Sequence, residues 1–121
     1  MVQIIAGEKG KGKTKQLLDQ VNAAIETATG NIVYLDKSQK HMHELSNKVR
    51  LINVADYPLT DLDEFIGFIC GIVSQDYDLQ AMYLDSFLTI ANITTDEEIC
   101  HAIEKLDVIS EKYNVAFVLS V

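Results

Sequence analysis

The chain opens with VQIIAGEKGKGKT at residues 2–14, where a short apolar run leads into a loop rich in glycine and lysine. The apolar run at residues 2–6 predicts a buried strand. Residues 13–28 repeat apolar side chains at spacings of three and four, which predicts an amphipathic helix on one side of the loop. A strand, a glycine-rich loop and a helix therefore follow one another directly.

The loop itself, GEKGKGKT at residues 7–14, matches the phosphate-binding pattern G-x-x-x-x-G-K-[ST] at every fixed position. Glycine lets the backbone approach phosphate closely, and successive backbone N–H groups at a helix amino end attract anions. In this pattern the lysine, here Lys13, reaches the outer phosphates and acts in catalysis, while the Thr14 hydroxyl binds Mg²⁺. We expect the following residues to contact a nucleotide: Gly7, Glu8, Lys9, Gly10, Lys11, Gly12, Lys13, Thr14 and Lys15.

The role of three lysines in the loop stays open, and a dinucleotide-binding loop is excluded. Lys9, Lys11 and Lys15 have no fixed role in the pattern, so they either strengthen the positive field or are ordinary solvated charges. The dinucleotide pattern G-x-G-x-x-G fails, because Lys15 stands where its third glycine would be.

The rest of the chain alternates the two kinds of apolar pattern. Further strands are predicted at Asn31–Asp36, 49–54 (at a sheet edge), 81–87 and 115–121, and helices at 60–74 and 94–114. This order predicts an α/β fold: a single domain over residues 1–121, with a mostly parallel five-stranded sheet and helices on both faces. Gly67 and Gly71 lie four residues apart on one helix, which predicts close packing of that helix against a neighbour.

Two predicted strands end in an aspartate. Asp85 follows the apolar run Ala81-Met82-Tyr83-Leu84, and Asp36 ends the second strand. The carboxyl edge of a parallel sheet is where such folds bind ligands, so we expect Asp85 to hold Mg²⁺ with Thr14. Asp85 as a simple turn cap is the alternative. For Asp36 we expect a catalytic role, in which it orients the attacking water. The alternatives are a contact with the ribose, a contact with a partner, and plain solvation.

With these residues in place, the chain resembles the P-loop NTPases of the RecA-like group. It is also similar to small clostridial-type ATP-binding proteins labelled twitching-motility-ATPase-like. The resemblance implies a minimal P-loop domain that binds ATP with Mg²⁺, a last strand beside the first, and Ser120 near the γ-phosphate. The chain departs from the group in two ways: Ser86 follows Asp85 where many ATPases have a glutamate, and Arg50 is its single arginine.

The charge and composition of the chain limit the classes of partner that it can bind. The net charge is −8, and residues 51–121 carry thirteen acidic against two basic side chains, which argues against a nucleic-acid partner. No apolar run approaches the roughly 18 residues of a membrane span, and two cysteines without metal-ligand spacing favour a cytoplasmic protein. The sequence predicts a nucleotide-binding protein with slow or partner-stimulated hydrolysis. The alternative is a non-catalytic module whose binding to a protein partner, or to itself, depends on nucleotide.

Overall fold

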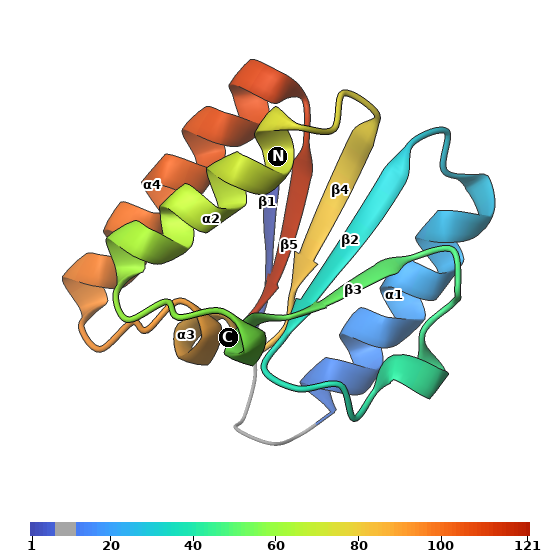
Figure 1. Ribbon diagram of the computed structural model, residues 1–121, viewed down its shortest axis with the longest axis horizontal. Coiled ribbons are helices and arrows are strands. Elements are labelled where there is room, and N and C mark those ends of the chain that lie inside the picture. The colour runs from blue at the N-terminus through green and yellow to red at the C-terminus, as the bar shows by residue number, and fades with distance from the viewer. Residues whose placement is uncertain (7–11) are drawn as a thin grey trace.

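A computed structural model describes residues 1–6 and 12–121 of the chain (Figure 1). Within these residues, all five strands pair in parallel in one sheet, in the order β1-β5-β4-β2-β3. The strands are β1 (Val2–Ile5), β2 (Asn31–Asp36), β3 (Arg50–Asn53), β4 (Leu79–Leu84) and β5 (Ala116–Ser120). The predicted α/β fold is confirmed, with β3 at a sheet edge and the last strand beside the first.

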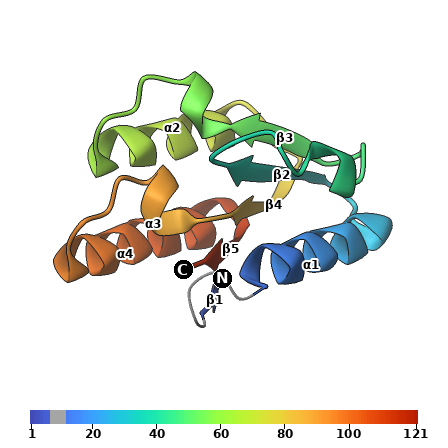
Figure 2. The ribbon, with the colours of Figure 1, turned by 90° about the horizontal axis from the view of Figure 1, so that it is seen from below.

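Helices cover both faces of the sheet, as Figure 2 shows. Helix α1 (Lys13–Thr27) lies on one face, and α2 (Leu62–Ser74) and α4 (Asp96–Tyr113) lie on the other. Three short helices complete the described part of the chain: η1 (Met42–Glu44), η2 (Val54–Asp56) and α3 (Phe87–Ile90). None of the helices in residues 1–6 and 12–121 combines the length and the apolar character that crossing a membrane requires.

The alternation of side chains along β2 explains why the core has two parts. Val33 and Leu35 point toward α2 and α4 and join the larger apolar cluster, whereas Ile32 and Tyr34 point toward α1 and join the smaller one. All four side chains are buried, with at most 5% of their surface exposed. A strand buried on both faces needs apolar residues at consecutive positions, which is the pattern of a central parallel strand.

The helix starts differ slightly from those predicted. The cap of α2 is Asp61, whose side chain accepts a hydrogen bond of 2.8 Å from the backbone N–H of Glu64. The neighbouring Thr60 donates its hydroxyl to the Glu64 carboxylate. The cap of α4 is Thr95, whose side chain accepts a hydrogen bond from the backbone N–H of Glu98.

The predicted strand at residues 81–87 is too long at its carboxyl end. Strand β4 ends at Leu84, and Ser86 adopts a left-handed conformation with φ of 54°. That conformation turns the chain sharply, so Phe87 begins α3 and does not continue the strand.

The prediction of close packing at Gly67 and Gly71 is wrong. A Cβ atom added at either glycine would meet no atom of the described structure within 4 Å. Both glycines lie on the exposed side of α2, so their spacing reflects no helix–helix contact there.

Candidate functional site

The carboxyl edge of the sheet gathers polar side chains from three strands. Asp36, Asp85 and Ser120 are each only 2% exposed, although they are polar. Each lies two residues after a side chain of the cluster beneath α1, these being Tyr34, Tyr83 and Val118. Because side chains two apart along an extended strand share a face, all three polar groups face the α1 side of the sheet.

Asp85 is the centre of this group. The Thr14 and Ser120 hydroxyls donate to its Oδ1 over 3.2 Å and 2.9 Å, and the Tyr34 hydroxyl donates to its Oδ2 over 2.9 Å. The Asp85 backbone N–H donates to the carbonyl of Leu35 over 2.9 Å. Three hydroxyl donors replace the water that a buried carboxylate loses, which makes this burial tolerable.

The amino end of α1 brings Thr14 to Asp85. Gly12 precedes the helix in a left-handed conformation, with φ of 74°, which favours glycine at this position. Lys13 and Thr14 begin the helix half-buried. The Lys13 ammonium group donates to the backbone carbonyl of Val121, beyond the end of β5. The structure therefore brings Lys13, Thr14 and Asp85 to one place.

The remaining predicted loop residues fall into two groups. The Lys15 side chain is 80% exposed and forms an ion pair with Asp19 over 3.0 Å, one turn along α1, so it does not join the group around Asp85. Gly7, Glu8, Lys9, Gly10 and Lys11 lie outside the described residues. Their contact with phosphate stays a prediction from the sequence pattern.

Asp36 lies at the end of β2, beside β4, the strand that Asp85 directly follows. Its Oδ1 accepts a hydrogen bond of 2.7 Å from the backbone N–H of Lys37, while its Oδ2 is buried and has no partner among the described residues. Burial raises the pKa of this carboxyl above its ordinary value, and the nearby charge of Asp85 raises the pKa further. A buried oxygen without a partner is costly, so it marks a position that stability alone does not explain.

Tyr34 is the residue that the sequence patterns missed. Its side chain is fully buried, and its pKa is raised first by burial and then by the charge and the hydrogen bond of Asp85. The phenol therefore keeps its proton and acts as a fixed donor to Asp85. The available signal was a hydroxyl within an otherwise aliphatic buried strand, two residues before Asp36.

Ser120 links Asp85 to the turn that follows it. Its hydroxyl donates to Asp85 and accepts a hydrogen bond of 2.8 Å from the backbone N–H of Ser86. This pair of bonds holds the carboxylate and fixes the turn into α3. Ser120 is thus a positioning residue for Asp85, on the strand next to β4.

The donor set suits a hard cation. Mg²⁺ in proteins takes oxygen ligands, usually one or two carboxylates together with phosphate oxygens and retained water. A Thr14 hydroxyl 3.2 Å from an Asp85 carboxylate oxygen supplies this kind of pair. No cluster of three or more His, Cys, Asp or Glu side chains able to hold a metal occurs in the described part of the chain. A cation here would need further oxygen ligands besides these two side chains.

Comparison with protein-family models and with curated proteins gives no match to this chain. The resemblance to P-loop NTPases therefore stays a prediction from residues 7–14 and Asp85.

Proposed function

We propose that this protein binds ATP with Mg²⁺ at the carboxyl edge of its sheet. The observation that carries the proposal is the hydrogen bond of 3.2 Å from the Thr14 hydroxyl to the Asp85 carboxylate. It lies at the amino end of the helix in which the phosphate-binding sequence pattern ends. A helix amino end favours negative charge, and the lysine beside it adds a full positive charge. These features together favour a polyphosphate ligand over an uncharged one.

Each residue of the group has a distinct part in this proposal. The Lys13 ammonium group, which now donates to a backbone carbonyl, would turn to the phosphate oxygens. Thr14 and Asp85 would hold Mg²⁺, which neutralises charge on the phosphates when bound. Tyr34 and Ser120 would keep the Asp85 carboxylate in place, because their hydrogen bonds do not depend on the ligand.

The same arrangement favours slow hydrolysis. Asp36 is the available acid for orienting a water molecule, since its Oδ2 has no partner in the described structure. Ser86 stands where many ATPases of this kind have a glutamate, and Arg50 lies at the start of the edge strand β3, on the opposite edge of the strand order from β1. Faster turnover would then need a partner that supplies positive charge.

Thermal unfolding with Mg-ATP, Mg-GTP and EDTA tests nucleotide binding. A ligand at about 100 times its Kd stabilises a fold by about 2.7 kcal/mol, which raises the Tm of a domain this long by about 10 °C. We expect this shift with Mg-ATP for the wild type and not for Lys13→Ala. Lys15→Ala is the matched control, because Lys15 is on the same helix turn but is paired with Asp19. No shift with any nucleotide would reject the proposal.

A second candidate is a nucleotide-dependent interaction module without turnover. It is favoured by Ser86, whose backbone N–H is bound to Ser120 and whose short side chain cannot replace a catalytic glutamate. Sedimentation with and without Mg-ATP, together with phosphate release, separates the two candidates. Turnover that Asp36→Asn lowers supports the ATPase, whereas self-association on Mg-ATP without phosphate release supports the module.

A further inference from the structure

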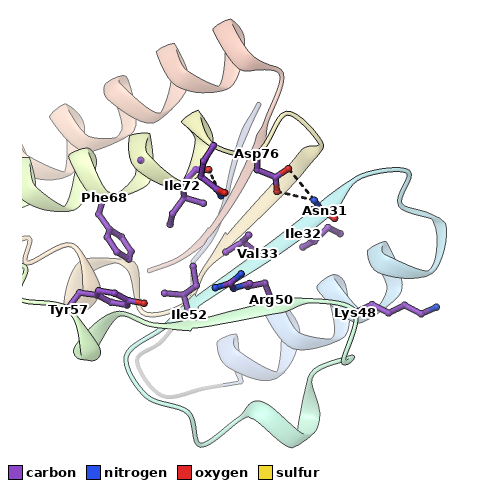
Figure 3. A pocket seen from close by; sticks show the side chains of 12 residues that line it. Asn31, Ile32, Val33, Lys48, Arg50, Ile52, Tyr57, Phe68, Ile72 and Asp76 are labelled. Atoms are coloured by element: carbon purple, nitrogen blue, oxygen red, sulfur yellow. Dashed lines mark hydrogen bonds between the residues drawn. The ribbon is translucent and has the colours of Figure 1, made fainter.

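A second cavity lies away from the Asp85 group. It is a groove of about 610 Å³ on the α2 face of the sheet, over the first half of β2 and the edge strand β3 (Figure 3). The Asp85 group lies on the other face and at the carboxyl edge. The groove therefore shares no lining residue with the Asp85 group, and a ligand in it would not depend on nucleotide binding.

The walls of the groove are mainly apolar. Val33 and Ile52 form the sheet side, and Phe68 and Ile72 project from α2 on the other side. Tyr57 closes one end, with its ring centroid 5.0 Å from that of Phe68. The groove stays open because Gly71, which also lines it, leaves the space of a side chain unfilled on α2.

One cation, the exposed side chain of Arg50, lies along this apolar groove. Figure 3 shows the guanidinium group of Arg50 between Val33 and Ile52, whereas Lys48 points away. Arg50 forms no ion pair or hydrogen bond with any side chain in residues 1–6 and 12–121. The carboxylate that lines the groove, Asp76, is engaged by the Asn31 side-chain amide over 3.0 Å. This hydrogen bond leaves the negative charge of Asp76 in place, but Arg50 and Lys48 outnumber it among the lining residues, so the charge of the groove is positive in a chain whose net charge is −8.

We propose that this groove binds a small organic carboxylate with an apolar body, its carboxylate on Arg50 and its body along Val33, Ile52 and Ile72. A planar guanidinium group matches a carboxylate with two parallel hydrogen bonds, and it loses little solvation when it does so. A volume of about 610 Å³ is within the usual range for small-molecule sites, and apolar walls with one oriented polar group are typical of them.

Three probes of equal chain length test the proposal: octanoate, octanol and octylammonium, each titrated into ¹⁵N-labelled protein by NMR. We expect amide shifts confined to β2, β3 and α2, with octanoate binding most tightly and octylammonium most weakly. The net charge of −8 attracts a cation and repels an anion, so this order can arise only from a local positive group.

Substitutions test whether octanoate binds in the groove at Arg50. Arg50→Gln should weaken octanoate binding about tenfold, the value of a charge-assisted hydrogen bond, and leave octanol unchanged. Gly71→Leu should weaken all three probes by filling the groove, and it faces open space, so the fold tolerates it. Lys105→Gln, exposed on α4, is the control for a lost positive charge. Octylammonium binding as tightly as octanoate, shifts spread over α4, or octanoate binding unchanged by Arg50→Gln would overturn the proposal.

Discussion

Because one carboxylate oxygen of Asp36 is buried without a partner in the described part of the chain, we expect a substitution there to stabilise the fold, whereas most core substitutions destabilise it. Asp36 is 2% exposed, and its Oδ2 has no partner among the described residues. A buried polar atom left unsatisfied costs about 1–3 kcal/mol. Asp36→Asn keeps the shape and leaves an unpartnered amide at the same place, so its gain comes only from removing the buried charge. We expect it to stabilise the nucleotide-free protein by about 1 kcal/mol at neutral pH.

The stability difference between Asp36→Asn and the wild type should also depend on pH. The pKa of Asp36 is raised in the folded protein, so between the ordinary value of about 3.9 and the raised value the folded state binds more protons than the unfolded state. The wild type therefore gains stability as the pH falls through the folded pKa. The advantage of Asp36→Asn should be complete above that pKa, shrink as the pH is lowered through it, and disappear below about pH 3.9.

Urea denaturation from neutral to acidic pH measures the difference. Asp107→Asn is the matched control, because Asp107 is exposed on α4, and its free energy of unfolding should change by less than about 0.5 kcal/mol. If Asp36→Asn is less stable than the wild type at neutral pH, or if the difference does not change with pH, the reasoning about the unpartnered oxygen is wrong. A stabilised variant with impaired phosphate release would show that the cost serves function.

Three further substitutions test separate parts of the structure. Tyr34→Phe removes the 2.9 Å donor to Asp85 and should cost about 1.5–3 kcal/mol in urea denaturation, against the smaller effect of Tyr83→Phe on the next strand. Gly67→Ala places a methyl group in open space on α2 and should stabilise the fold by about 0.5–1 kcal/mol; a loss of stability would mean that α2 packs there. Gly30→Ala should instead lower the Tm, because its Cβ would lie 2.2 Å from the carbonyl oxygen of Asp78, and an unchanged Tm would contradict that close approach.

Local patterns in the sequence were enough to predict the order of helices and strands and the parallel sheet. They also placed Thr14 and Asp85 together, because a helix amino end and a strand end meet at the carboxyl edge of such a sheet. Tyr34 could not be found in this way, since its bond to Asp85 depends on the register of β2 against β4, which pairs Leu35 with Leu84.

The errors have equally local causes. The periodicity of residues 60–74 indicates a helix but not which side of it is covered, so Gly67 and Gly71 were predicted to be packed when they are exposed. The strand at 81–87 was predicted too long because Phe87 is apolar, whereas the left-handed Ser86 redirects the chain before it. The groove at Arg50 depends on how far α2 extends over β2 and β3, which no local pattern encodes.

The hydrogen bonds of Asp85 determine how much its carboxylate would have to rearrange to bind a cation. Two of its three hydroxyl donors, Tyr34 and Ser120, come from buried strands, and the third, Thr14, comes from the helix that follows the loop. Only Thr14 needs to turn for Asp85 to accept a cation, so the carboxylate requires little rearrangement. The proposed hydrolysis would require more of the same residues, because its candidate acid, Asp36, has a raised pKa and a single backbone donor. If the proposed function holds, this geometry suits binding more than turnover. We therefore expect Tyr34→Phe to weaken nucleotide binding and Asp36→Asn to impair only phosphate release.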